Sequence, residues 1–193
     1  DDPVPGLEGH EALVRTHLAA PGVEADRGNL LLVDPLASLE GQARRVANPG
    51  CYSSAVVLLV RPVVDAGLIA ADAAFSVHAL SGYSGGGRSM IERWENPSGR
   101  LKNLPYEAPY SVGKLHKHIP EVMPWGGLTN EPQFIPAVGP FRCGMRVQVM
   151  IPAKVLPRAG AGKAMLETLA ARYADEAFVQ IEPLSDGDTA DEF

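Results

Sequence analysis

The strongest candidate for covalent chemistry in this sequence is Cys51. It follows the turn-forming Asn-Pro-Gly of residues 48–50 and precedes an apolar run over 55–60, a pattern that predicts a turn and then a buried helix. The free N–H groups and the positive dipole end of such a helix favour a thiolate and can hold a developing oxyanion. Local sequence leaves two roles open for Cys51: a nucleophile, or a small buried residue at a helix start.

His116, His118 and Glu121 form the second candidate group. In an extended segment the two imidazoles point to the same side. One interpretation is a general base beside an orienting carboxylate. Another is a metal site, because His-x-His with a nearby carboxylate suits zinc, iron or manganese; a solvated, polar strand end is the third. A cysteine followed about 65 residues later by a histidine and a carboxylate suits thiol catalysis in an intracellular protein.

A glycine-rich run over 82–87 holds four glycines in six residues after a predicted strand, which lets a ligand approach the backbone closely. It lacks the G-x-G-x-x-G pattern that binds dinucleotides, and a flexible loop is the alternative interpretation. Cys143 lies in a strand-like stretch and is interpreted as a small buried hydrophobic residue.

The elements that must position these residues follow an α+β pattern. Pro62 is expected to kink or break the helix that begins at Cys51, and the stretch over 92–109 is expected to be a long loop. The other expected elements are strands over 29–33, 75–80, 133–138, 142–151 and 178–181, an extended segment over 113–119, and helices over 11–18, 39–46 and 161–174.

Length and composition exclude several classes of protein. The 193 residues are enough for one sizeable domain with a core. A net charge of -6 disfavours a nucleic-acid binder, and no run of apolar residues is long enough to cross a membrane. Two cysteines cannot build a disulfide framework and no signal peptide is visible at the start of the chain, so a reducing, cytoplasmic location is expected.

Four blocks of the sequence carry a family resemblance. They read ANPGCYSS followed by LLVRPVVDAGLI, then HALSGYSGGGRSMI, KLHKHIPEV and FIPAVGPFRCGMRVQVMIP. In order and spacing they resemble the N-acetyl-gamma-glutamyl-phosphate reductase family, in the shorter of its two types, over residues 44–183. One departure is Ser54, where the family usually has a threonine; the hydroxyl is kept.

The resemblance implies a fold like that of glyceraldehyde-3-phosphate dehydrogenase, in which a Rossmann cofactor domain joins an α+β catalytic domain with a mixed, mostly antiparallel sheet. It implies NADPH-dependent reduction of N-acetyl-glutamyl 5-phosphate to N-acetyl-glutamate 5-semialdehyde, with release of phosphate, in arginine biosynthesis. It assigns Cys51 as the nucleophile that forms a thioester and His116 as the general acid/base, with no metal. The other implied site residues are His118, Glu121, Ser81, Arg88 and Tyr110 toward the substrate, Lys117 as a further partner for phosphate or carboxylate, and Gly82, Ser84, Gly85 and Gly86 along the nicotinamide.

The resemblance also divides the chain. Residues 1–43 are a leader that does not match the family, residues 44–184 are the catalytic and substrate domain, and residues 185–193 are an acidic tail. The Rossmann cofactor domain is missing from the matched text, so NADP(H) is expected to be bound mainly by a domain absent from this chain. The chain alone is therefore expected neither to bind NADPH tightly nor to turn over.

Other functions compete with this one. A related reductase could act on aspartyl phosphate or on carrier-bound aminoadipyl phosphate. A non-catalytic dimerisation or interaction domain is a different class, and a metal-dependent hydrolase using the histidine pair is a third. The expected partners are a small acyl-phosphate substrate and further copies of the chain, with neither nucleic acid nor membrane.

Overall fold

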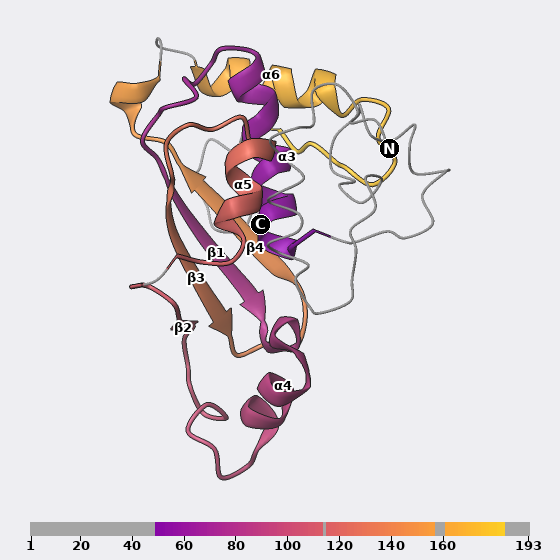
Figure 1. Cartoon of the computed structure of the whole chain (residues 1–193). Helices are drawn as coiled ribbons and strands as arrows, with labels where there is room; N and C mark the ends of the chain where they lie inside the picture. The colour runs from indigo at the N-terminus through magenta and orange to yellow at the C-terminus, as the bar shows by residue number, and fades with distance from the viewer. Residues whose placement is uncertain (1–48, 114, 157–160, 184–193) are drawn as a thin grey trace, which may run out of the picture.

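The computed structural model describes residues 49–113, 115–156 and 161–183. The elements expected over 11–18, 29–33 and 39–46, and the acidic tail over 185–193, lie outside these ranges. Figure 1 shows the described elements, which in chain order are α3 (Cys51–Asp65), β1 (Ser76–Gly82), the 3-10 helix η2 (Tyr83–Gly86), α4 (Gly87–Glu95), β2 (Ala108–Pro109), α5 (Ile119–Trp125), β3 (Gln133–Gly139), β4 (Met145–Met150), the 3-10 helix η3 (Ala153–Val155) and α6 (Ala161–Arg172).

The strands form one sheet in the order β2-β3-β1-β4. Strands β1 and β3 are parallel, whereas β1 with β4 and β2 with β3 are antiparallel. A parallel pair needs a long crossover connection, and the chain through α4 and α5 supplies it. The prediction of an α+β fold with a mixed, mostly antiparallel sheet is confirmed.

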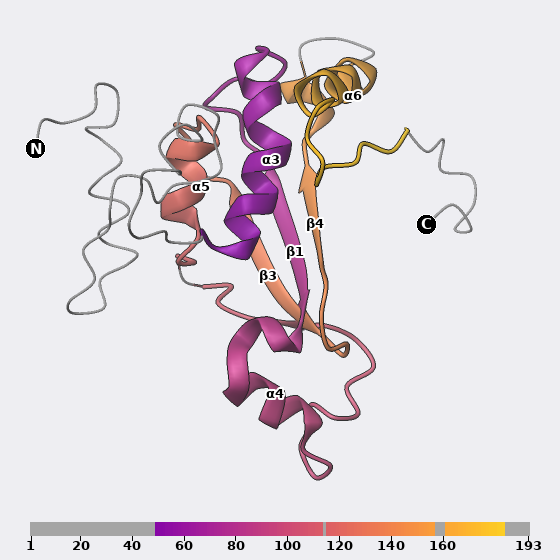
Figure 2. The same cartoon turned by 90° about the vertical axis from the view of Figure 1, so that its right-hand side faces the viewer.

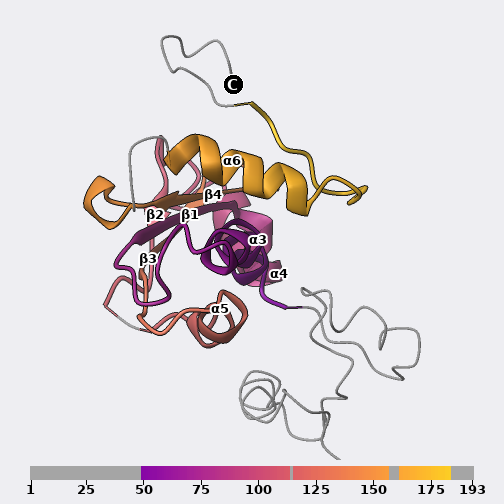
Figure 3. The ribbon, with the colours of Figure 1, turned by 90° about the horizontal axis from the view of Figure 1, so that it is seen from above.

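Helices α3 and α5 cover one face of the sheet, and α6 packs beside α3 (Figure 3). Strand β1 alternates as a half-buried strand should: Val77 and Ala79 are fully buried toward the helices, whereas His78 and Leu80 are only half-buried on the other face. Burial of each Val or Ile side chain in this core contributes about 1.5–3 kcal/mol. The central core residues are Val56, Val60, Val63, Ile69, Phe75, Val77 and Val122.

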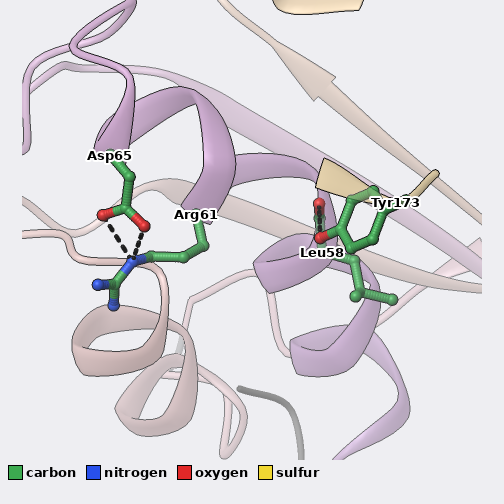
Figure 4. Close-up of polar contacts among 4 residues, drawn as sticks. All are labelled: Leu58, Arg61, Asp65 and Tyr173. Atoms are coloured by element: carbon green, nitrogen blue, oxygen red, sulfur yellow. Dashed lines mark hydrogen bonds and ion pairs between the residues drawn. The ribbon is translucent and has the colours of Figure 1, made fainter. Parts of the chain in front are cut away.

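Helix α3 continues through Pro62 to Asp65, so the expectation that this proline breaks the helix is wrong. Proline has no N–H, and the carbonyl of Leu58 four residues earlier therefore loses its usual helical donor. The hydroxyl of Tyr173, just after α6, donates to the Leu58 carbonyl oxygen at 2.7 Å (Figure 4). Further along α3, the Arg61 Nε atom donates to both carboxylate oxygens of Asp65 on the exposed surface. We infer that Tyr173 compensates for the hydrogen bond that Pro62 removes.

This compensation predicts a specific double-mutant cycle. Tyr173→Phe keeps the ring but removes the donor, and should cost about 1–2 kcal/mol of unfolding free energy in urea. In a Pro62→Ala background the new N–H can serve the Leu58 carbonyl, so the same substitution should cost measurably less. An equal cost of Tyr173→Phe in both backgrounds would contradict the inferred compensation.

Two segments differ from the sequence prediction: helix α4 and residues 178–181. Helix α4 lies past the carboxyl end of β1 (Figure 2). Its last residues, 92–95, fall in the stretch over 92–109 that was expected to be a long loop. Trp94 is its one buried residue, and the Trp94 ring stacks on Tyr83 with centroids 5.8 Å apart. A helix that buries so little has few apolar positions from which it could be predicted. Residues 178–181 form no strand: Phe178 is fully exposed, and the segment has turn bonds instead of a strand partner.

Candidate functional site

Cys51 is the first residue of α3, and its side chain is exposed. Gly50 before it has extended backbone (ψ 141°), and the Gly50 carbonyl accepts the first helical hydrogen bond from the Ser54 N–H at 3.0 Å. The predicted start of a helix at Cys51 is therefore confirmed. The alternative in which Cys51 is a small buried residue is wrong, because the thiol reaches solvent at the positive end of the helix dipole.

His116 and His118 are both buried and in contact, with ring centroids 4.7 Å apart. The sequence predicted an extended segment here, and that prediction is wrong. The chain turns at residues 117–118 and enters α5. Pro120, in the first turn of α5, favours the start of a helix over a strand. Lys117, between the two histidines, is exposed. A tight turn thus brings together the two imidazoles that an extended strand was expected to align.

The backbone N–H of His118 donates to Nδ1 of His116 at 3.2 Å. A neutral imidazole that accepts at Nδ1 carries its proton on Nε2. That Nε2 atom lies 3.4 Å from the hydroxyl oxygen of Tyr110. The fold therefore holds His116 as the Nε2–H tautomer, a proton donor at this atom.

Tyr52, which the sequence analysis did not select, connects the histidines to the sheet. Its buried ring contacts His116, His118 and Phe134, with centroids 5.7–6.0 Å apart. Its hydroxyl lies 2.8 Å from Oγ of Ser81 and 3.1 Å from the carbonyl oxygen of Ala137. Its position directly after Cys51, in the first turn of α3, was the only signal in the sequence that could have selected Tyr52.

Burial raises the pKa of Tyr52, although its hydrogen bond with Oγ of Ser81 opposes the shift. Burial also raises the pKa of Tyr110, and the charges of Tyr52 and Cys51 push it the same way. Both phenols therefore stay protonated well above neutral pH and remain hydrogen-bond donors. The hydroxyls of Tyr110 and Tyr52 continue the line of hydrogen bonds from His116 toward Ser81.

The raised values predict a late alkaline titration. Tyr52 and Tyr110 should ionise above the ordinary tyrosine value of about 10 when phenolate absorbance of the folded chain is followed with pH. Because these folded pKa values lie above the unfolded value of about 10, their contribution to stability is complete below about pH 10. It is lost as the pH rises from there toward the folded values. Tyr110→Phe should remove one late-titrating group. Ionisation of Tyr110 at or below about pH 10 in the folded chain would contradict this.

Glu121, in the first turn of α5, is buried and reaches the start of α3. Its Oε2 atom accepts the Gly50 N–H at 2.9 Å and the hydroxyl of Ser53. Ser53 is fully buried and was also missed by the sequence analysis, because serine in a first helical turn usually serves only local caps. A Cβ atom on Gly50 would overlap the His118 ring, which is why glycine is required there.

Ser81 and the glycine-rich run lie at the carboxyl end of β1. Ser81 is buried, and a Cβ on Gly85 would lie 3.6 Å from its Oγ. The N–H groups of Gly82 and Ser84 each donate at 2.9 Å to carbonyls of the loop between β3 and β4. A Cβ on Gly82 would come within 2.6 Å of that loop's backbone, so close packing explains this glycine.

Cys143 lies in this same loop and is exposed, so its expected burial in a strand is wrong. Strand β4 begins only at Met145. Gly144, with φ 102°, takes a conformation that breaks the extended stretch before the strand. Arg88 pairs with Glu92 and not with a residue of the histidine group. It lies exposed on α4, with its Nε atom 2.8 Å from a carboxylate oxygen of Glu92.

Two classes of site find no support among the residues that the structure describes. No group of three or more His, Cys, Asp or Glu side chains there could hold a metal ion. No helix in the described ranges is both long and apolar enough to cross a membrane.

Comparisons with known proteins agree on one family. A family model described as the dimerisation domain of semialdehyde dehydrogenase matches residues 51–190. An N-acetyl-gamma-glutamyl-phosphate reductase of Burkholderia lata is 42% identical over 144 residues, which are 75% of this chain and 45% of that protein. Proteins named N-acetyl-gamma-glutamyl-phosphate reductase 2 are 37% identical in Pseudomonas putida, over 74% of this chain and 45% of the relative, and 36% identical in a Nostoc species, over 75% and 46%. The chain thus spans about half the length of the curated relatives it matches.

Proposed function

Because the chain belongs to the semialdehyde dehydrogenase dimerisation-domain family, we propose that it is the catalytic part of an N-acetyl-gamma-glutamyl-phosphate reductase. One observation carries the proposal. Cys51 stands exposed at the start of α3, between Gly50, which packs against the His118 ring, and Tyr52, whose ring contacts both imidazoles. An exposed thiol at a helix start, whose two chain neighbours pack against the histidines, suits covalent thiol catalysis.

In the first half-reaction the Cys51 thiolate attacks the carbonyl carbon of the acyl phosphate. A carbon–sulfur bond forms, the carbon–oxygen bond to phosphate breaks, and phosphate leaves with the electron pair. The oxyanion that develops on the carbonyl oxygen is stabilised by N–H groups at the start of α3 and by Nε2–H of His116. The product of this step is a thioester on Cys51.

In the second half-reaction the thioester is reduced to a thiohemiacetal. NADPH supplies the hydride when it is bound. Hydride addition leaves an alkoxide on the former carbonyl carbon. His116, which the resemblance assigns as the general acid/base, stabilises this alkoxide through its Nε2–H. The alkoxide then collapses to the aldehyde as the carbon–sulfur bond breaks and the free thiolate leaves with the electron pair. The Tyr110 hydroxyl beside Nε2 orients the imidazole, and its raised pKa keeps it protonated throughout.

The glycine-rich run fits the nicotinamide end of the cofactor but not its pyrophosphate. The N–H groups of Gly82 and Ser84 already bind carbonyls of the neighbouring loop, so this turn does not present them to a phosphate. Gly85 and Gly86 are exposed, and a Cβ on Gly85 would lie 3.6 Å from Oγ of Ser81. Tight binding of NADP(H) is therefore assigned mainly to the Rossmann cofactor domain that the family resemblance implies.

Two further assignments belong to this proposal. Ser81, Tyr110 and His118 are assigned as substrate contacts, as the family resemblance implies, and Arg88 and Lys117 are exposed cations for phosphate or carboxylate. The chain forms homo-oligomers through the sheet face opposite α3 and α5, where half-buried and exposed residues lie side by side. These residues are His78, Leu80, Ile135, Gln148 and Met150.

Mass spectrometry of the acylated chain tests the proposed function. The 193-residue chain is mixed with N-acetyl-glutamyl 5-phosphate without NADPH, quenched in acid and digested. We expect an N-acetyl-glutamyl adduct on the peptide that contains Cys51, with release of one phosphate per adduct. No adduct, or an adduct on Cys143 alone, would refute the proposal.

A further inference from the structure

We propose that Glu121 is a positioning residue, which fixes the place of Cys51 at the start of α3 instead of contacting the substrate. This inference rests on the proposed function and deepens it. The family resemblance implied that Glu121 orients or binds the substrate; its contacts in the fold select a different role.

Glu121 holds the chain on both sides of Cys51. Its Oε2 atom accepts the N–H of Gly50 at 2.9 Å and the hydroxyl of Ser53. The first donor precedes Cys51 by one residue, and the second follows it by two. Cys51 is therefore the exposed member of a short segment that is fastened at both ends to one carboxylate oxygen.

A helix N-terminus is usually fastened from within, by a side chain of its own first turn that accepts the N–H of the residue before the helix. Helix α3 has no such capping side chain at Gly50. Glu121 supplies the acceptor instead. It belongs to another helix, α5, and lies 71 positions from Gly50 in the chain. Tying the start of α3 to α5 also ties it to the turn that carries both histidines, since α5 begins directly after His118.

The environment of Glu121 opposes a role in direct recognition. The hydroxyl bound to its Oε2 atom belongs to the fully buried Ser53, and the backbone N–H bound to the same oxygen belongs to Gly50. The His118 ring covers Gly50 from the other side. A substrate with negative charge on both its phosphate and its carboxylate is also a poor partner for a carboxylate.

The test compares length and charge at this position. Glu121→Gln keeps the side-chain length and an oxygen that accepts both bonds, whereas Glu121→Asp keeps the charge but is one methylene too short. We expect the maximal rate of Cys51 acylation to stay within about threefold in Glu121→Gln and to fall about 10- to 100-fold in Glu121→Asp and Glu121→Ala. The half-saturating concentration of acyl phosphate should stay within about twofold, because bound substrate does not meet this side chain. Glu167→Gln and Glu167→Ala, on the exposed surface of α6, are the matched controls.

The opposite pattern overturns the proposal. A raised half-saturating concentration with an unchanged maximal rate would place Glu121 at the substrate. A larger loss in Glu121→Gln than in Glu121→Asp would mean that charge matters and position does not, and unchanged kinetics in all variants would remove any role. If Glu121→Ala does not fold, the Gln and Asp variants decide.

A second readout separates this inference from the proposed function. Amide hydrogen exchange of Gly50, followed by NMR, should be slow in the wild-type chain and in Glu121→Gln, and about tenfold faster in Glu121→Asp. A wild-type chain that accepts no acyl group would refute the proposed function alone, and this exchange pattern would still test the fastening of the segment. Fast exchange of Gly50 in the wild-type chain would refute the positioning role whatever the acylation result.

Discussion

The Cys51→Ser variant is expected to lose acylation by N-acetyl-glutamyl 5-phosphate, by about 10⁴-fold or more. A serine hydroxyl at the same helix start cannot ionise near neutral pH, and no second nucleophile replaces it. Stopped samples analysed by mass spectrometry give the rate of adduct formation. Removal of the other thiol in Cys143→Ser should leave the rate unchanged, since Cys143 lies in the loop before β4.

The same pair of variants tests what the helix start contributes. Both cysteines are exposed, so burial cannot separate their reactivity. Alkylation by iodoacetamide near neutral pH should still be faster at Cys51, because α3 offers it free N–H groups and the positive dipole end. Equal alkylation of the two thiols in the folded chain would count against an activated nucleophile.

His116→Ala should slow acylation of Cys51 about 10²- to 10⁴-fold, while leaving its alkylation by iodoacetamide within about threefold. The two reagents differ in one respect: attack on the acyl phosphate builds an oxyanion, and attack on iodoacetamide does not. Nδ1 of His116 accepts the His118 N–H, so the imidazole can serve the oxyanion from Nε2. Iodoacetamide kinetics and acylation kinetics are measured on the same preparation.

His116→Gln is the matched variant, because its amide N–H₂ can replace the donor at Nε2. We expect it to recover part of the acylation rate. If His116→Ala slows both reactions equally, His116 is instead the base that deprotonates Cys51. That result would contradict the donor role but not the thioester chemistry.

The start of α3 could be predicted because its signals are local. An Asn-Pro-Gly sequence and the apolar run that follows it predict where the helix begins, and both signals lie close together in the sequence. The types of His116, His118 and Glu121 were also sufficient to select them. Their conformation was not predictable, because alternation of His, Lys and His fits a strand as well as a turn, and the following proline decides for the helix.

The parts that were missed depend on contacts between distant segments. Pro62 is tolerated because the hydroxyl of Tyr173, just after α6, donates to the Leu58 carbonyl. The sequence of α3 alone does not predict that donor. Tyr52 matters through its bonds to Ser81 and Ala137 on two different strands. Local propensity likewise misassigned residues 178–181, since a strand exists only where a neighbouring strand completes its hydrogen bonds.

The parallel pairing of β1 with β3 has a consequence for folding. Ser76 and Gln133, which lie opposite one another at its start, are 57 positions apart, and Tyr52 is 85 positions from Ala137. Loops of this size must close before their contacts can repay the lost chain entropy, so topologies of this kind fold slowly. The environment of Cys51 is built from these long-range contacts and cannot precede them. Until these contacts form during synthesis or refolding, Cys51 lacks the tertiary surroundings that it has in the folded chain.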